Sequence, residues 1–283
     1  MNEAQFYARA DGKAVVCALC PHNCSINDGQ AGICGVRQNK GGTLYAAGYG
    51  LVSSIALDPI EKKPLYMFHP GKNVLSIGGF GCNLHCPFCQ NCEISLEYKS
   101  RWESAERLSP EKIVALAKYY VPERNIGIAY TYNEPFVGYE FVYDCAKLVC
   151  EAGLKNVLVT NGTISPEPLE KLLPYIDAMN IDLKGFTNRF YKNLGGDFEA
   201  VKETIKAAYK RCHIEITTLI IPGENDSDEE IASLAKWLAS LDRAIFLHLT
   251  RFYPRHKYSD KAPTTQDTIL RLREVAKKYL ENV

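Results

Sequence analysis

Residues 78–92 read GGFGCNLHCPFCQNC and contain three cysteines, Cys82, Cys86 and Cys89, in the spacing C-x3-C-x2-C. Three thiolates on one short loop can ligate three corners of a cubane [4Fe–4S] cluster and leave the fourth iron open, whereas the ordinary four-cysteine arrangement closes every iron. An open position on a metal is where a substrate or cofactor binds. The stretch therefore predicts a cluster with one free iron, and the rest of the chain is organised around it.

A zinc knuckle or simple packing would also account for these cysteines. Structural zinc takes four N or S ligands and prefers two-residue spacings, so His85 or Cys92 would have to complete the set. The three-residue gap between Cys82 and Cys86 favours the iron–sulfur interpretation. Cys92 itself is expected to be a small buried apolar residue.

A second group of cysteines lies in residues 14–37, AVVCALCPHNCSINDGQAGICGVR. The group consists of Cys17, Cys20, Cys24 and Cys34. Four thiolates at short spacing form a closed structural zinc site or ligate a second iron–sulfur cluster, and the spacing does not choose between the two metals. A cysteine-rich loop without metal is the third alternative.

The C-x3-C-x2-C spacing with an aromatic residue, Phe88, before its last cysteine resembles the signature of the radical S-adenosylmethionine (SAM) enzymes. The sequence GCNLHCPFCQN resembles the corresponding motif of the branch that contains pyruvate formate-lyase activating enzyme. Together with the N-terminal cysteines, it most resembles the radical SAM component of the AmmeMemoRadiSam system. The resemblance covers about residues 17–260 and implies a [4Fe–4S] cluster at the three cysteines with SAM on its open iron.

The bulk composition narrows the class of protein. The chain has 283 residues, of which 33 are basic, 33 acidic and 11 cysteine. Balanced charge gives no sign of a nucleic-acid partner. The first residues contain no signal-peptide core and no apolar run is long enough for a bilayer, so we expect a cytoplasmic protein without a membrane partner. Seven clustered cysteines in such a compartment indicate metal rather than disulfides.

From residue 74 onwards, short apolar runs alternate with amphipathic segments. We expect strands at 74–80, 125–132, 155–162, 178–185, 213–221 and 244–252. We expect helices at 109–121, 140–153, 165–176, 198–211, 227–241 and 265–281. Residues 43–57 suggest one or two further strands, and 58–71 read as a turn and linker.

Six strands alternating with helices predict a parallel sheet with right-handed crossovers, either an open doubly wound sheet or a barrel. The chain contains neither a Gly-x-Gly-x-x-Gly turn nor a phosphate-binding Gly-Lys-Ser/Thr loop. The resemblance implies an α/β fold, a partial (β/α)6 TIM-like barrel. We therefore divide the chain into an N-terminal cysteine-rich metal-binding extension and linker, residues 1–73, and the barrel, residues 74–283.

Polar residues recur where the predicted strands end, which is where barrels of this kind place their chemistry. They are Thr131, Tyr132, Asn133 and Glu134 after the second strand, Thr160 and Asn161 after the third, Asp182 and Lys184 at the fourth, Thr217 and Thr218 late in the fifth, and His248 and Arg251 late in the sixth. A zwitterionic amino acid held on an open iron needs acceptors for its ammonium group and a cation for its carboxylate. Lys184 suits the carboxylate as a compact positive charge.

The resemblance implies further roles in binding SAM. Asn133-Glu134 corresponds to the motif that contacts the SAM amino group, Phe88 lies against the adenine, and Thr160-Asn161 line the cofactor site. The chain departs from the activating-enzyme pattern at two positions. Val159 stands where an aspartate helps Asp182's counterpart to hold a monovalent cation, and Phe252 stands where a histidine is usual, whose role would pass to His248 or Arg251.

The leading functional hypothesis is a radical SAM enzyme that makes a 5′-deoxyadenosyl radical and takes a hydrogen atom from a backbone glycine, as glycyl-radical-enzyme activators do. Its partners would be a protein or peptide substrate and an electron donor such as flavodoxin or ferredoxin. The first alternative is radical modification of another peptide or a small metabolite, because the four extra cysteines precede the main motif rather than follow it. A non-catalytic zinc-binding interaction protein is the alternative from another class.

Overall fold

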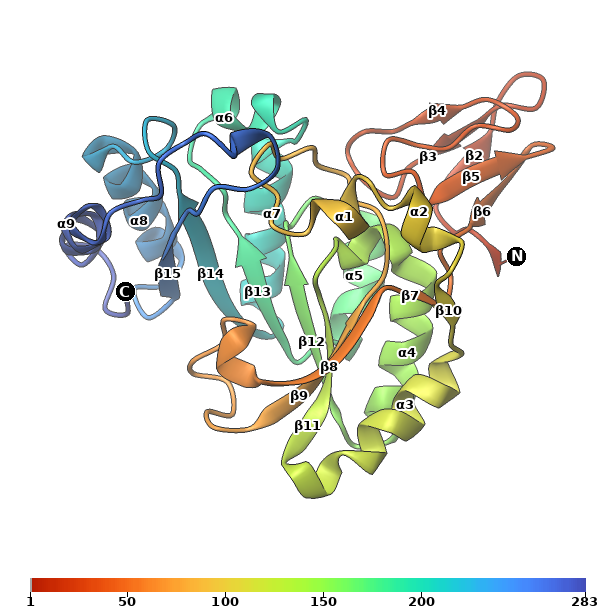
Figure 1. Ribbon diagram of the computed structural model, residues 1–283, viewed down its shortest axis with the longest axis horizontal. Helices are drawn as coiled ribbons and strands as arrows, with labels where there is room; N and C mark the ends of the chain where they lie inside the picture. Colours follow the sequence, from red (N-terminus) through yellow and green to blue (C-terminus); the bar gives the residue numbers. More distant parts are fainter. Residues whose placement is uncertain (1) are drawn as a thin grey trace.

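The computed structural model describes residues 2–283 and is built on a seven-stranded sheet (Figure 1). Six strands are parallel and follow one another in chain order, while β8 (Ser54–Pro59) pairs antiparallel with the first of them. The parallel strands are β9 (Asn73–Gly78), β11 (Asn125–Tyr130), β12 (Lys155–Thr160), β13 (Ala178–Asp182), β14 (His213–Ile220) and β15 (Phe246–Arg251). Each matches a predicted strand, and the partial (β/α)6 barrel is confirmed, with β15 and β8 as its two edges.

The long helices cover one face of the sheet. Because the strands follow chain order and parallel crossovers are right-handed, each connecting helix packs on the same side. These helices are α3 (Pro110–Tyr119), α4 (Tyr139–Glu151), α5 (Pro166–Leu172), α7 (Phe198–Tyr209), α8 (Asp228–Leu241) and α9 (Gln266–Ala276). The last helix ends before the predicted residue 281, since the chain turns so that the Asn282 carbonyl accepts a hydrogen bond from the Leu247 N–H.

Several short helices were not expected from the sequence, because a single turn carries too little periodicity to stand out. They are α1 (Cys92–Ser95), α2 (Lys99–Trp102) and α6 (Asn188–Asn193), with the 3-10 helices η1 (Ile60–Lys62), η2 (Val121–Glu123), η3 (Pro135–Gly138) and η5 (His256–Tyr258). A further 3-10 helix, η4 (Leu173–Tyr175), forms the end of the helix predicted at 165–176. The helices α1 and α2 lie directly after the cysteine loop and form part of the surroundings of the site (Figure 1).

Side chains alternate between the two faces of each strand. On β14, Ile214 and Ile216 pack in the core beneath the helices. Thr217 and Leu219, further along the same strand, point to the opposite, concave face and line a cleft. Since no helix crossover is placed on that face, the concave side near the C-terminal strand ends stays accessible.

The other half of the concave face is closed by the segment 59–72. The sequence predicts a turn and linker over 58–71, and the structure shows that this segment also packs against the sheet. Ile60 and Leu65 are fully buried and pack against Val74 and Ala129 on the sheet. The Pro64 carbonyl also accepts a hydrogen bond of 2.8 Å from the Asn180 side chain. The segment is a plug, and its two apolar anchors are too few to produce a periodic signal.

The plug is held to the sheet by one buried carboxylate, that of Glu215 on β14. It accepts hydrogen bonds from the backbone N–H groups of Tyr66 (2.9 Å) and Met67 (2.7 Å) and from His213 (2.9 Å) and His248 (2.6 Å). Burial alone would raise the pKa of Glu215, but these hydrogen bonds outweigh it and lower the pKa to about 2.

A Glu215→Gln variant should lose about 3 kcal/mol of unfolding free energy at pH 7, because a buried, hydrogen-bonded charge is removed from its partners. The pKa is lowered in the folded state, so this contribution is present above the unfolded value of about 4.3 and disappears as the pH falls towards 2. Urea unfolding should show a gap between variant and wild type that narrows over that range. The exposed Glu203→Gln should stay within about 0.5 kcal/mol of wild type at every pH. A constant gap would contradict the assignment.

The N-terminal region forms two small antiparallel sheets at one end of the molecule, far from α9 (Figure 1). One contains β2 (Tyr7–Arg9), β3 (Val15–Cys17) and β4 (Ser25–Ile26), and the other contains β1 (Asn2–Glu3), β6 (Thr43–Ala46) and β5 (Arg37–Lys40). A ribbon of β7 (Leu51–Val52) and β10 (Glu106–Arg107) follows. Val15, Cys17 and Leu19 belong to the same apolar core as the helices of the barrel.

The main sheet begins before the boundary expected at residue 73. Strand β8 lies in the expected extension 1–73, yet it pairs with β9 along its whole length, from Ser54 opposite Gly78 to Pro59 opposite Asn73. The boundary between the N-terminal extension and the barrel at residues 73 and 74 therefore stays a prediction made from the sequence. In residues 2–283, no helix is both long and apolar enough to cross a membrane.

Candidate active site

A cleft of about 1170 Å³ opens at the C-terminal ends of the parallel strands. It is lined by the three cysteines of the loop and by the residues predicted to bind SAM: Cys82, Cys86, Phe88, Cys89, Asn133, Glu134, Thr160, Asn161, Asp182 and Lys184. The topology explains this convergence, because parallel strands that follow chain order bring all their C-terminal ends to one rim.

The cysteine loop leaves β9 through glycines and is held from the next strand by Asn133. The Asn133 amide donates to the carbonyls of Phe80 (3.0 Å) and Gly81 (3.0 Å), and its carbonyl accepts from the Gly79 N–H (2.8 Å). Gly81 has a φ of +83°, and a Cβ there would lie 2.6 Å from the Cys34 carbonyl oxygen. Asn133 therefore shapes the loop and keeps little hydrogen-bonding capacity for a ligand.

The spacing of the sulfurs tests whether the residues present fit a cluster or zinc. Tetrahedral zinc with bonds of about 2.3 Å holds its sulfurs about 3.8 Å apart. Within residues 2–283, the group of three ligand atoms that all lie within 4.8 Å of one another is Cys92, Glu97 and His256. The cysteine loop presents Cys82, Cys86 and Cys89 to one cleft, and three thiolates are the donor set of a [4Fe–4S] cluster with one open iron.

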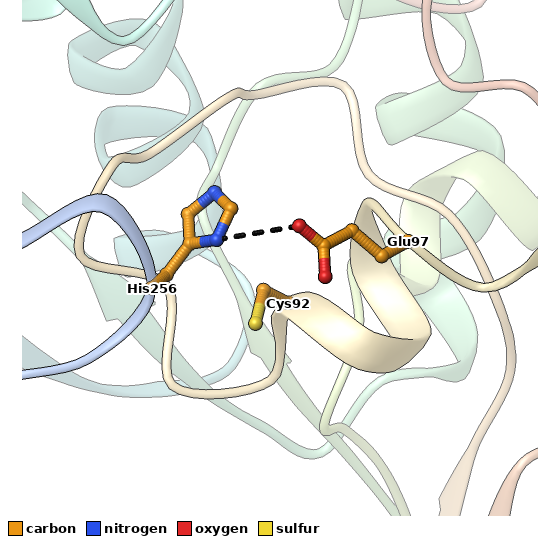
Figure 2. A group of neighbouring side chains, drawn as sticks. All are labelled: Cys92, Glu97 and His256. Carbon is orange, nitrogen blue, oxygen red and sulfur yellow. Dashed lines mark ion pairs between the residues drawn. The ribbon is translucent and has the colours of Figure 1, made fainter. Parts of the chain in front are cut away.

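Cys92 is directed to a group of its own at the edge of the loop (Figure 2). Its sulfur lies near the carboxylate of Glu97 and the imidazole of His256, which form an ion pair of 3.6 Å. His256 comes from η5, so this group links the segment after β15 to the segment after β9. Cys92 is buried, as predicted, and it does not line the cleft.

Burial disfavours the ionised form of the cleft thiols. It raises the pKa of Cys86 to about 11 and raises that of Cys82 well above its ordinary value. Metal ligation requires thiolates, so binding of a cluster must release protons here.

Glu134 provides a buried acceptor in the cleft. Its carboxylate accepts hydrogen bonds from the Thr160 hydroxyl (2.7 Å) and from the backbone N–H groups of Asn161 (2.8 Å) and Phe136 (3.0 Å). Burial raises the pKa of Glu134 to about 7, although these hydrogen bonds act in the opposite direction. A carboxylate has about four lone-pair sites, so one acceptor position remains for a ligand.

Lys184 provides the cation of the cleft. Its ammonium group lies 2.8 Å from the Asp182 carboxylate. Burial opposes the charge, but the Asp182 carboxylate outweighs it and raises the pKa of Lys184. Glu134 and Lys184 therefore offer an acceptor and a positive charge, the two groups that a zwitterionic ligand needs.

Asn161 connects the Glu134 side of the cleft to Cys82. Its amide nitrogen lies 3.6 Å from the Cys82 sulfur and donates at 2.9 Å to the Asn83 side-chain oxygen. Its own oxygen accepts from the Thr163 N–H at 2.8 Å. The Thr-Asn turn thus orients the loop as well as lining the cleft.

Thr131, Tyr132, Val159 and Thr217, which the sequence places at the strand ends, also line the cleft. The lining residues that were not identified from the sequence are Lys62, Lys63, Gln90, Asn91, Ser95, Leu219 and Thr250. Strand alternation could have identified Leu219 and Thr250, since they continue the concave face. Lys62 and Lys63 come from the plug and are held by Asp58, at 2.8 and 2.6 Å, which only tertiary structure reveals.

His248 and Arg251 were expected to take over the role of the missing histidine at the site. Neither residue lines the cleft, so that expectation is wrong. His248 is bound to Glu215 beneath the cleft, and the Arg251 guanidinium donates to the Thr264 carbonyl at 2.6 Å. Phe252 is fully buried in an apolar cluster with Phe88. Each of these side chains is used for packing or anchoring.

The four N-terminal cysteines also converge on one cavity, of about 370 Å³. We call it the N-terminal cysteine pocket, and its sulfurs belong to Cys17, Cys20, Cys24 and Cys34. Asn83, the neighbour of Cys82 in the chain, lines the same cavity. The two cysteine groups are therefore adjacent in space.

Comparison with known proteins identifies relatives over nearly the whole chain. A family model described as the radical SAM superfamily matches residues 76–235. An uncharacterized protein of Methanocaldococcus jannaschii is 43% identical over 98% of this chain and 82% of its own length. A second protein of that organism, assigned by name only as a glycyl-radical enzyme activating enzyme, is 28% identical over 76% of this chain and 89% of its own length. The crystal structure of Streptococcus suis SuiB bound to S-adenosylmethionine has the same fold, with a TM-score of 0.53, 16% identity, and coverage of 70% of this chain and 45% of that one.

Proposed function

The chain belongs to the radical SAM superfamily, and we propose that it cleaves SAM reductively at a [4Fe–4S] cluster on Cys82, Cys86 and Cys89 to activate a glycyl-radical enzyme. One observation carries the proposal: three spaced thiolates, the acceptor Glu134 and the cation Lys184 line a single cleft. When bound, the cluster and SAM supply the radical chemistry, in which one electron splits SAM into methionine and a 5′-deoxyadenosyl radical that takes a hydrogen atom from the substrate.

The side chains of the cleft bind and orient the cofactor. Lys184 would hold the SAM carboxylate, and the free acceptor position of Glu134 would hold its ammonium group. Phe88, which is buried and stacks on Phe190 with ring centroids 6.4 Å apart, offers an apolar wall for the adenine. Thr160 and Asn161 keep the Glu134 carboxylate in place, so the acceptor is preorganised.

The second carboxylate that a bound cation would need is missing. Val159 lines the cleft where the activating-enzyme pattern has aspartate, and the Asp182 carboxylate is occupied by Lys184. The Lys184 ammonium group therefore supplies the positive charge that a bound monovalent cation would otherwise provide. We do not include a monovalent cation in the proposal.

The open edge of the barrel supports a macromolecular substrate. The sheet ends at β15 and β8, so the concave face is not enclosed, and a polypeptide segment could approach the cleft from the side. The relative assigned by name as an activating enzyme supports a backbone glycine as the target. The electron donor would be a flavodoxin or ferredoxin.

A second candidate is the same radical chemistry on another peptide or a small metabolite. The observation that favours it is the placement of the additional cysteines, which precede the main motif and form their own pocket next to it. Metal analysis separates both candidates from a non-catalytic zinc protein.

The test is anaerobic reconstitution followed by reduction with dithionite in the presence of SAM. Formation of 5′-deoxyadenosine is expected, with iron rather than zinc bound. Mixing with a glycyl-radical enzyme should then produce a glycine-centred doublet in the EPR spectrum. If 5′-deoxyadenosine forms but no doublet appears with any partner from the same genome, the second candidate is favoured. Zinc without product would overturn both.

The pKa of Glu134 predicts how SAM binding depends on pH. Below about 7 the carboxylate is protonated and no longer attracts the ammonium group, so SAM affinity should fall as the pH decreases from 8 to 6. Glu134→Gln should bind SAM about tenfold more weakly at pH 8, with little pH dependence, because a charge-assisted hydrogen bond is lost. Equilibrium dialysis with the reconstituted protein measures both.

Apo protein provides an independent check of Glu134. Its pKa is raised in the folded state, so ionisation opposes folding, and wild type should lose stability relative to Glu134→Gln as the pH rises from about 4.3 to 7. A parallel pH profile for the two proteins would contradict the assignment.

A further inference from the structure

The N-terminal cysteine pocket is built by a hairpin and the loop after it. Cys17 ends β3, Cys20 and Cys24 lie in the turn towards β4, and Cys34 comes from the loop before β5. The remaining lining is mostly apolar and includes Leu19, Ile26 and Phe136, with Arg37 and Asn83 among the polar exceptions. Four thiols facing a closed apolar cavity are suited to a metal site.

The spacing of the four sulfurs is compatible with a cluster. Among the described residues 2–283, no three of them lie within 4.8 Å of one another. Tetrahedral zinc holds its sulfurs about 3.8 Å apart, whereas the thiolates of a cubane cluster each bind a different iron and lie further apart.

Arg37 provides an independent indication of an anionic occupant. It is 1% exposed and lines the pocket. One terminal nitrogen donates to both carboxylate oxygens of Glu140, at 3.0 Å each, and the other donates to the Gln5 carbonyl. The remaining Nε–H is buried without a partner in the structure. The sulfurs of an anionic cluster would supply the missing acceptor.

We propose that the N-terminal cysteine pocket binds a second [4Fe–4S] cluster, closed by four thiolates, which passes single electrons to the main site. The relay role rests on the proposed radical SAM function. With every iron ligated by cysteine, this cluster has no position for SAM and acts only as a carrier. A flavodoxin- or ferredoxin-type donor reduces this second cluster by one electron. Transfer to the main cluster reoxidises it, and no bond is made or broken in the pocket.

The route between the two sites is short and runs through Asn83. Asn83 lines the N-terminal cysteine pocket together with Cys20, and it is covalently joined to Cys82. Asn161 bridges the Asn83 oxygen and the Cys82 sulfur. A second close approach joins the backbones, because Gly81 packs on the Cys34 carbonyl so tightly that only glycine fits. One buried residue therefore lies between the two sites.

The first measurement is the metal content and EPR spectrum of the anaerobically reconstituted full chain. Wild type should bind about eight iron atoms per chain and no zinc, and Cys24→Ala should bind about four. The fully reduced wild type should show magnetic interaction between two neighbouring clusters, and this interaction should disappear in the variant. The variant should retain the spectral change that SAM causes at the remaining cluster, which shows that the main site is intact. If Cys24→Ala does not fold, Cys34→Ser serves the same purpose.

The second measurement separates the relay from the main chemistry. Cys24→Ala should still cleave SAM with dithionite but should lose cleavage driven by a reduced flavodoxin. About four irons plus zinc in wild type, or unchanged flavodoxin-driven cleavage in the variant, would overturn the proposal. Eight irons with magnetic interaction but no 5′-deoxyadenosine would instead support the second cluster and contradict the proposed function.

Discussion

A Cys86→Ala variant is expected to bind about four fewer iron atoms per chain than wild type and to form no 5′-deoxyadenosine from SAM. Cys86 is the middle ligand of the loop, and its side chain is buried against Leu84, Phe88 and Phe252. The two remaining thiolates cannot hold a cubane in a fixed position facing Glu134 and Lys184. Iron analysis, visible absorbance and chromatography of the products measure the loss.

Cys92→Ala is the matched control for this prediction. Cys92 is buried like Cys86 and lies six residues along the chain, but its sulfur is grouped with Glu97 and His256 outside the cleft (Figure 2). The control should keep the cluster and the product. If Cys92→Ala lost both while Cys86→Ala kept them, the ligand set proposed here would be wrong.

A Glu140→Ala variant is expected to lose about 3–5 kcal/mol of unfolding free energy, because it leaves the buried Arg37 guanidinium without its carboxylate. Both side chains are almost completely inaccessible, and Glu140 also accepts a hydrogen bond of 2.7 Å from the Gln5 N–H. This ion pair joins β5 of the N-terminal region to α4 of the barrel. Urea unfolding measures the change, and limited proteolysis should show faster cleavage within residues 1–52.

Two comparisons make the Glu140 result specific. Glu151→Ala, at the exposed end of the same helix, should change stability by less than about 0.5 kcal/mol. The double variant Arg37→Met/Glu140→Leu should recover part of the loss, since it removes both charges and keeps the packing. A loss below about 1 kcal/mol for Glu140→Ala would mean that the N-terminal region is held mainly by apolar contacts.

The sequence was most informative where function depends on short-range spacing. The loop from Cys82 to Cys89 places three sulfurs on one turn, whatever surrounds it. Strand periodicity and chain order were enough to bring Glu134, Asn161 and Lys184 to the same rim. The sequence could not show that Asn133 is occupied in holding the loop, because its hydrogen bonds go to backbone groups more than 50 residues away.

The long-range contacts were not predictable. The plug 59–72 is recognised by its contacts with distant residues of the sheet, among them Glu215. His248 was misplaced because nothing local shows that it lies beneath the cleft. The interpretation of the N-terminal cysteines as zinc or iron–sulfur ligands also stayed open, since residue spacing along the chain does not measure sulfur spacing in space.

By itself, the sequence of this protein determined the radical SAM motif, the order of strands and helices, and the polar residues that close each strand, because these depend on covalent neighbours and on the two periodicities of secondary structure. Only the tertiary structure decided that a plug closes one half of the concave face, that Arg37 and Glu140 join the N-terminal region to the barrel, and that Asn83 lies between the two cysteine groups. Those contacts join residues about 60 to 150 positions apart, and the burial that makes them strong exists only after the chain has folded.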